Sequence, residues 1–298
     1  MDQIATPKND ESTPGNPPVL LVCDDLFLIP RLQDAARAAG LSPVVVDSPE
    51  AIDAAGDPTP RPVPITEPVE GSDGRLLRAV VDQLPALIVF DVSSTALPWA
   101  RWIQVLKTSS ATRRIPILAF GPHVQEEALE RARGLGADRV VTRGQLQAHL
   151  AEILRREARP VDPDVVRAGC ERPASPQARQ GLDALRAGRY FEAHDHLERA
   201  ILDDPGPDGT VYRCVLHLAV ACLHTERGNW RGAQKMLLRM RPWLAPLPDR
   251  CRGVDVTTLR RALAVLQSSL DQWHAGDQVP SSPLPPPAIE FAAEAPAT

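Results

Sequence analysis

The chain has 298 residues, which is room for two domains, and 43% of them are apolar, which is enough for ordinary hydrophobic cores. Its net charge of −5 does not favour nucleic acid as a partner. No apolar run approaches the roughly 18–20 residues of a membrane span, so no membrane is expected as a partner either. The opening stretch is polar, contains prolines and lacks a basic region followed by an apolar one. We therefore expect residues 1–18 to be a disordered lead and not a signal peptide.

The cysteines favour a reducing compartment. They are odd in number and no two of them form a CxxC pair. Two of them, Cys214 and Cys222, stand in an apolar stretch, where a reduced thiol behaves as a small hydrophobic side chain. We therefore expect reduced thiols and a cytoplasmic location. The five cysteines are Cys23, Cys170, Cys214, Cys222 and Cys251.

Residues 19–157 alternate short apolar runs with stretches of helical periodicity. This alternation predicts an α/β domain with a doubly wound, five-stranded parallel sheet. Between the second strand and the second helix, Asp57–Pro68 is so rich in proline that we expect an extended surface insert. The expected strands are Val19–Cys23, Pro43–Val46, Ala86–Phe90, Ile115–Phe120 and Arg139–Val141, and the expected helices are Ile29–Ala39, Asp73–Gln83, Pro98–Lys107, Val124–Gly134 and Gln145–Arg156.

Three carboxylates stand at the ends of expected strands. Asp24 and Asp25 follow the first strand, and Asp91 follows the third. Because parallel strands present their carboxyl ends at one edge of the sheet, these side chains should lie together. Such a group could hold a Mg²⁺ ion, and one carboxylate could then accept a phosphoryl group. Ser93 and Ser94 follow in the same loop and could bind an oxyanion, although serine-rich loops are common.

This run of strands and acidic residues, about Val19–Arg156, resembles a CheY-like response-regulator receiver domain. The resemblance implies that Asp24 and Asp25 are the acidic pair and that Asp91 is the phosphoacceptor.

Two positions depart from the receiver pattern. Gly121 stands where the resemblance implies a hydroxyl residue after the fourth strand, and Arg143, followed by Gly144, stands where it implies a lysine and a proline. The first change removes the group that reads the phosphoryl, and the second keeps the charge but changes its shape. We interpret the domain as a degenerate receiver that binds a protein partner or a second copy of the chain. Phosphorylation of Asp91 is the alternative.

The remainder of the chain reads as all-helical. Residues 158–176 contain several prolines, and we expect this stretch to be a linker. Residues 177–275 predict a bundle of about five helices, and the proline-rich residues 276–298 predict a disordered or polyproline tail. The expected helices are Gln177–Ala187, Tyr190–Leu202, Thr210–Arg227, Trp230–Trp243 and Val256–Trp273.

Polar residues interrupt the apolar faces of two of these helices. On a helical wheel, His194 and Glu198 fall inside the apolar arc of the second helix. The third helix is apolar all round except for one stripe of Arg213, His217 and His224. Because a buried charge is costly unless it is paired, we expect the imidazoles and the carboxylate to face one another in the core.

Three short sequence motifs in this half match motifs of a known family, and they occur in the same order. They are Tyr-Phe-Glu-Ala-His-Asp-x-Leu-Glu from Tyr190, Leu-Ala-Val-Ala-x-x-His ending at His224, and Arg-Gly-Asn-x-x-Gly-Ala ending at Ala233. Over Ser175–Leu247 the chain resembles the domain-of-unknown-function 309 family of small all-helical domains. That resemblance implies a fold, since the family has no established activity. The family's recurring polar and glycine positions are His194, Glu198, His224, Asn229 and Gly232, whereas at His217 the family usually has Gln.

The polar residues of the helical half allow three interpretations. The first is a hydrogen-bonded network that fixes helix packing in a non-catalytic regulatory or binding protein. The second is a metal-dependent enzyme whose Zn²⁺ or Fe²⁺ ligands are His194, Glu198, His217 and His224. The third is a tetratricopeptide-like adaptor, because Gly188-Arg189-Tyr190 is echoed 40 residues later by Gly228-Asn229-Trp230. We favour the first interpretation.

Overall fold

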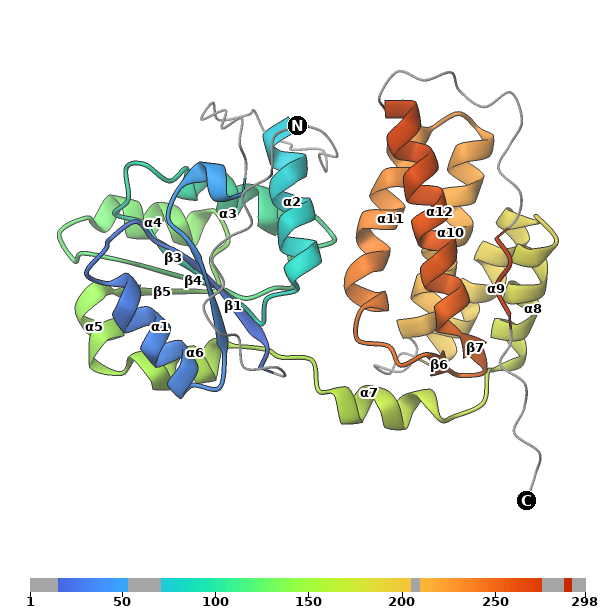
Figure 1. The fold of residues 1–298 in the computed structure, drawn as a ribbon, viewed down its shortest axis with the longest axis horizontal. Helices are drawn as coiled ribbons and strands as arrows, with labels where there is room; N and C mark the ends of the chain where they lie inside the picture. The colour runs from blue at the N-terminus through green and yellow to red at the C-terminus, as the bar shows by residue number, and fades with distance from the viewer. Residues whose placement is uncertain (1–15, 53–70, 205–209, 275–286, 291–298) are drawn as a thin grey trace, which may run out of the picture. The chain divides into compact units, whose positions relative to one another are not determined.

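The computed structural model of the protein describes residues 16–52, 71–204, 210–274 and 287–290. The chain forms two compact units, which meet in sequence at Pro160 and Val161 (Figure 1). Residues 1–15 of the predicted lead, the predicted insert at Asp57–Pro68 and most of the predicted tail lie outside the described residues. Within the described ranges, no helix has both the length and the apolar composition to cross a membrane.

The first unit contains the predicted parallel sheet. Its strands lie in the order β2-β1-β3-β4-β5, and every pair of neighbours is parallel. Every residue of β3 and β4 is buried, as expected for apolar strands that are covered on both faces. The prediction of a five-stranded, doubly wound sheet is confirmed. The strands are β1 (Pro18–Val22), β2 (Ser42–Val46), β3 (Leu87–Asp91), β4 (Ile117–Gly121) and β5 (Arg139–Thr142).

Helices cover both faces of this sheet. Helices α1, α5 and α6 share one hydrophobic cluster with β1, β3 and β4, whereas α2, α3 and α4 pack against one another on the opposite face (Figure 1). A buried ion pair between Asp73 and Arg101 joins α2 to α3. The helices are α1 (Ile29–Ala38), α2 (Gly71–Gln83), α3 (Trp99–Thr108), α4 (Glu126–Gly134), α5 (Arg143–Ala148) and α6 (Leu150–Glu157), with a short 3₁₀ turn η1 (Pro49–Ala51) after β2.

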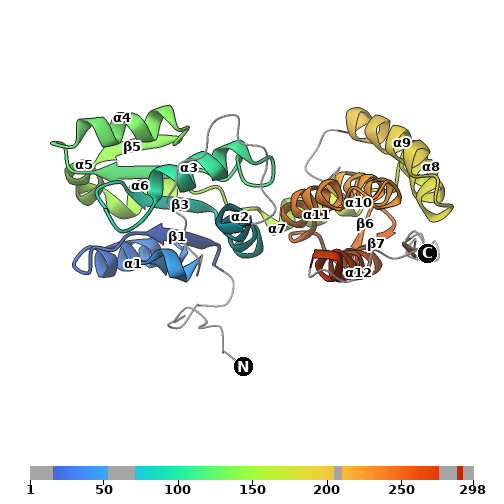
Figure 2. The same ribbon diagram turned by 90° about the horizontal axis from the view of Figure 1, so that it is seen from above.

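The second unit is a helical bundle, as predicted. Helices α8 and α9 lie side by side, α10 packs between α9 and α11, and α12 covers α11 (Figure 2). The elements are α7 (Pro163–Cys170), α8 (Pro176–Arg186), α9 (Tyr190–Asp203), α10 (Thr210–Glu226), α11 (Trp230–Leu244), the two-residue strands β6 (Arg250–Cys251) and β7 (Val254–Asp255), and α12 (Val256–His274).

The echo in the sequence marks two helical hairpins of this unit. Gly188 ends the turn after α8 with a φ of 73°, and Gly228 does the same after α10 with a φ of 66°. A residue with a side chain is disfavoured at these angles, so glycine lets the chain reverse. An aromatic residue, Tyr190 or Trp230, then begins the next helix.

The region predicted as a linker is largely part of the helical unit. Residues 158–176 contain α7, whose Val166 is buried in the core of the bundle. The expectation of reduced thiols is wrong for two cysteines, since Cys170 in α7 forms a disulfide with Cys251 in β6. These two residues are 81 positions apart, so no local spacing signalled the bond. The other three cysteines are free and buried.

Part of the predicted tail is also ordered. Ile289 is buried among the side chains of the helical core, and the main chain of residues 289 and 290 is hydrogen-bonded to the bundle. The prediction of a disordered tail is therefore wrong for residues 287–290.

Removing the disulfide should lower the stability of the helical unit. We expect the double variant Cys170→Ala/Cys251→Ala to lose about 2–5 kcal/mol of unfolding free energy, because the bond closes a long loop in the unfolded chain. Urea unfolding followed by circular dichroism measures this. A reducing agent should produce the same loss in the unaltered protein and no change in the double variant. Equal stability of the two proteins under oxidising conditions would contradict the prediction.

Candidate functional site

The candidate site lies at the carboxyl edge of the parallel sheet. Asp24 and Asp25 follow β1, Asp91 ends β3, and Arg143 begins α5 directly after β5. Strands β1 and β3 are neighbours, which brings Asp25 close to Asp91. Strand β4 lies between β3 and β5 in the sheet and ends at Gly121.

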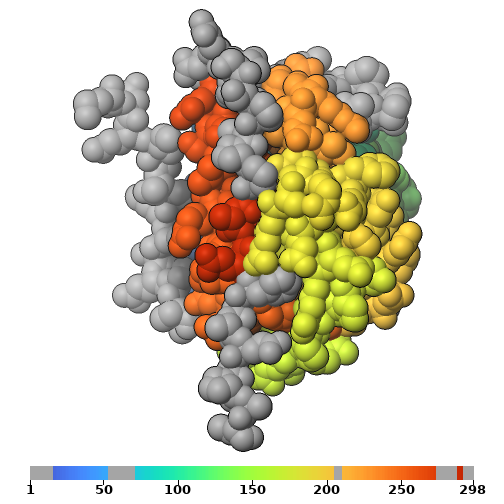
Figure 3. All heavy atoms as spheres, turned by 90° about the vertical axis from the view of Figure 1, so that its right-hand side faces the viewer, coloured from blue at the N-terminus to red at the C-terminus, as the bar shows by residue number. Residues whose placement is uncertain are grey.

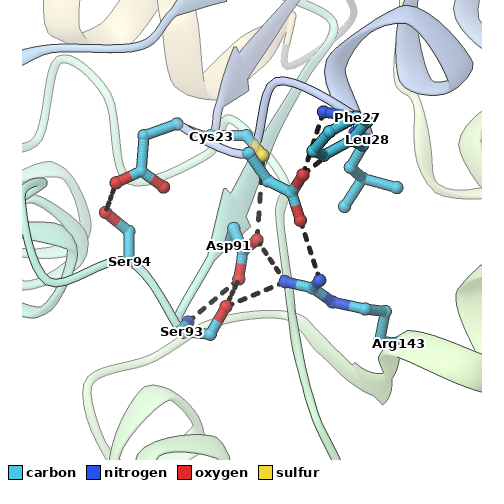
Figure 4. A network of polar contacts seen from close by, with 9 residues as sticks. Cys23, Phe27, Leu28, Asp91, Ser93, Ser94 and Arg143 are labelled. Atoms are coloured by element: carbon cyan, nitrogen blue, oxygen red, sulfur yellow. Dashed lines mark hydrogen bonds and ion pairs between the residues drawn. The ribbon is translucent and has the colours of Figure 1, made fainter.

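Asp91 is the buried centre of this site, with 1% of its surface exposed. Its Oδ1 accepts hydrogen bonds from the Ser93 amide at 2.9 Å and the Ser93 hydroxyl at 2.5 Å. Its Oδ2 accepts from Arg143 Nη2 at 2.8 Å and from the Cys23 thiol at 3.7 Å (Figure 4). Both carboxylate oxygens are thus engaged by donors.

Cys23 acts as a protonated donor in this network. Burial, together with the charges of Asp91 and Asp25, raises the pKa of its thiol to about 12. A thiol with such a pKa keeps its proton at neutral pH, which suits a hydrogen bond to a carboxylate and does not suit a nucleophile.

One guanidinium joins two of the carboxylates. Arg143 Nη1 donates to Asp25 Oδ2 at 2.9 Å, while Nη2 donates to Asp91 Oδ2 and, at 2.9 Å, to the Ser93 hydroxyl (Figure 4). The side chains of Arg143 and Asp25 are each 29% exposed, so the network reaches the surface on that side. A planar fork with several donors can span two acids in this way, which a lysine ammonium does less well.

Asp24 takes no part in the Arg143 network. Its Oδ2 accepts from the Ser94 hydroxyl at 2.7 Å, and that hydroxyl in turn accepts from the Leu97 amide at 3.0 Å. Of the three carboxylates predicted as Mg²⁺ ligands, Asp25 and Asp91 therefore share Arg143, whereas Asp24 is bonded to Ser94. In the part of the chain that the structure describes, no three or more His, Cys, Asp or Glu side chains are grouped so that they could hold a metal ion.

The glycine at the hydroxyl position of the receiver pattern has a local physical cause. A Cβ added to Gly121 would lie 2.8 Å from Val92 Cγ2, which is closer than real Cβ contacts. A serine or threonine could stand here only if the Val92 side chain moved. The close packing of β4 against the loop after β3 thus favours glycine at position 121.

The helical unit does not assemble the predicted cluster. Glu198 is exposed on α9, and His194 is 34% exposed, with its Nδ1 lying 3.2 Å from Oδ1 of the neighbouring Asp195. The prediction that these two side chains face His217 and His224 in the core is wrong for Glu198. The reason is that α9 buries a narrow stripe, and Glu198 lies one residue, about 100° of helix, beyond it. The buried residues of α9 are Tyr190, Ala193, Leu197 and Ala200.

The remaining family positions build the turn between α10 and α11. Asn229 Oδ1 accepts from the Gly232 amide at 2.9 Å and caps α11, while Asn229 Nδ2 lies 3.2 Å from His224 Nδ1. A Cβ on Gly232 would lie 2.8 Å from that imidazole nitrogen, so only glycine fits without a shift. Burial and the charge of Arg227 lower the pKa of His224, which favours the neutral imidazole. His217 is half-buried on α10 and shares no metal-binding group with these residues.

Comparison with known proteins identifies one family model and several structures. Residues 178–236 match the model of the domain of unknown function DUF309. The N-terminal half is similar to the receiver domain of the sensor histidine kinase PA1611 from Pseudomonas aeruginosa, with 17% identity and a TM-score of 0.35 over 48% of this chain and 98% of that one. It is also similar to the Vibrio cholerae chemotaxis protein CheY4, with 15% identity and a TM-score of 0.35 over 48% and 99%. No curated protein matches the chain.

The strand order supplies the fold assignment. The order β2-β1-β3-β4-β5 is the flavodoxin-like order, which CheY shares. The chain therefore joins a receiver-like α/β unit to a helical unit in which residues 178–236 match the DUF309 model. Both predicted resemblances are confirmed.

Replacing Arg143 should destabilise the receiver-like unit. In Arg143→Met, we expect a loss of roughly 2–3 kcal/mol of unfolding free energy, because the buried Asp91 carboxylate loses its cationic partner. The matched control is Arg133→Met, which removes an exposed pair with Glu130 and should cost less than about 0.5 kcal/mol. Chemical unfolding measures both. Equal losses in the two variants would contradict the assigned role of Arg143.

His224 should make stability depend on pH. Its folded-state pKa is lowered, so the unfolded chain binds the proton more readily. The group then has no effect above its ordinary pKa of about 6.5 and destabilises the fold increasingly below it. The unfolding free energy of His224→Gln, relative to the unaltered chain, should rise as pH falls from about 7.5 to about 5.5. Urea unfolding at stepped pH measures this, and a difference that stays constant would contradict it.

Proposed function

We propose that this is a non-catalytic regulatory or binding protein whose receiver-like unit is a docking module held in one state by Arg143. The observation that carries the proposal is that both carboxylate oxygens of Asp91 already accept hydrogen bonds. Its carboxylate is buried and accepts from Ser93, Arg143 and Cys23, so neither oxygen is free to attack a phosphoryl donor. The guanidinium supplies permanently the positive charge that a metal ion would supply in a phosphorylation site.

The same network shapes the surface that we propose for docking. Asp25, which pairs with Arg143, also accepts hydrogen bonds through Oδ1 from the amides of Phe27 and Leu28, at 3.0 and 3.2 Å. This fixes the loop that displays Leu26 and Phe27, whose side chains are 76% and 91% exposed. Large exposed apolar side chains at a structured loop are typical of protein contacts.

The partner that suits this surface is a protein, either another chain or a second copy of this one. Exposed apolar side chains beside a partly exposed ion pair match the apolar core and polar rim of protein interfaces. The net charge of −5 gives no electrostatic reason to prefer nucleic acid. The helical DUF309 unit would then act as the effector of the docking event.

Incubation with a small phosphodonor tests the proposal. The unaltered protein, incubated with acetyl phosphate and Mg²⁺, should show no gain of a phosphoryl group by intact mass spectrometry, because Arg143 and Ser93 occupy the Asp91 oxygens. An unrelated active receiver treated in parallel shows that the donor works. A stable mass gain that is lost in Asp91→Asn would contradict the proposal.

A further inference from the structure

The helical unit binds a short segment of its own C-terminal region, which belongs to none of its helices or strands. Residues 287–290 lie between α8 and α12 on the surface of the bundle (Figure 3). Ile289 is 1% exposed, whereas Ala288 and Glu290 on either side of it are exposed. One side chain therefore anchors this segment in the core of the bundle.

The other contacts of this segment are made through its main chain. Arg186 Nε, at the end of α8, donates to the Ile289 carbonyl at 2.5 Å. The Asp255 amide of β7 donates to the Glu290 carbonyl at 2.9 Å, and the Glu290 amide donates to Thr258 Oγ1 of α12 at 3.2 Å. Main-chain hydrogen bonds next to a buried side chain are the features by which proteins recognise extended peptides.

The groups that hold the segment are themselves held by secondary structure. The Thr258 hydroxyl donates to the Asp255 carbonyl at 2.7 Å, which turns a lone pair toward the Glu290 amide. Asp255 pairs with Arg250 across the β6–β7 hairpin, and that hairpin is joined to α7 by the disulfide of Cys251. The groups that contact the segment are thus positioned by α12, by the β6–β7 hairpin and by the disulfide.

From these contacts we infer that the site between α8, β7 and α12 is a peptide-binding site, and that Pro287–Glu290 is its built-in ligand. Its partner is a segment of another protein with one aliphatic anchor, bound through the main chain of that anchor and of the residue after it. Only residues 275–286 join α12 to the bound segment, so the chain's own ligand competes at an effective concentration on the order of millimolar. A partner that makes more contacts than one anchor and three hydrogen bonds would displace it. This inference does not depend on the state of Asp91.

Binding of a labelled synthetic peptide with the sequence of residues 283–294 tests this inference. The full chain carrying Ile289→Asp cannot bury its own anchor, so it should bind the peptide at least tenfold more tightly than the unaltered chain does, as measured by fluorescence anisotropy. The matched control is Ala288→Asp, which changes an exposed neighbour and should leave binding as in the unaltered chain. A peptide that carries the same isoleucine-to-aspartate change should not bind to any of the three proteins.

Equal binding to all three proteins, or no binding to a folded Ile289→Asp chain, would overturn the inference. A second measurement on the unaltered chain applies even if that variant does not fold. Millimolar unlabelled peptide should increase the hydrogen exchange of the Glu290 amide at least tenfold, because the chain's own segment leaves Thr258. An unchanged exchange rate at that amide would also overturn the inference.

Discussion

The receiver-like unit depends on one interaction, the Arg143 guanidinium that bridges Asp25 and Asp91. A carboxylate as buried as Asp91 is costly unless it is neutralised and hydrogen-bonded. Arg143, Ser93 and Cys23 together satisfy both of its oxygens. Because the cation belongs to the chain, this arrangement of hydrogen bonds is complete without a metal ion or a phosphoryl group.

Two residues, Gly121 and Asp25, lie at the same edge of the sheet as the Arg143 bridge. Gly121 at the end of β4 lies so close to Val92 that a Cβ would be 2.8 Å from Val92 Cγ2, which disfavours any larger residue at that position. Asp25 connects the bridge to the loop that exposes Phe27, so the charge network and the proposed docking surface share a residue. The acids that resemble a phosphorylation site are thus hydrogen-bonded to side chains of the same unit.

The sequence predicts the helices and strands, and the residues at the strand ends, better than it predicts which side chains contact one another. The apolar runs placed Asp91 and Arg143 at strand ends, because strand periodicity and βα alternation decide that much. Loop geometry turned Asp24 toward Ser94, which no pattern encodes. In the helical half, a helical wheel gives the angle of each residue around the helix axis but not the width of the stripe that is buried. The sequence therefore predicts a buried Glu198, which the structure shows to be exposed. The contacts that no local spacing can signal are the Cys170–Cys251 disulfide and the burial of Ile289.

The most direct test of this account is a double-mutant cycle between Arg143 and Asp91. Unfolding free energies are measured for the unaltered chain, Arg143→Met, Asp91→Asn and the double variant. The account predicts a coupling energy of about 1.5 kcal/mol or more, because each side chain loses its principal partner when the other is replaced. A coupling energy within error of zero would show that the two groups do not support one another, and would contradict the account.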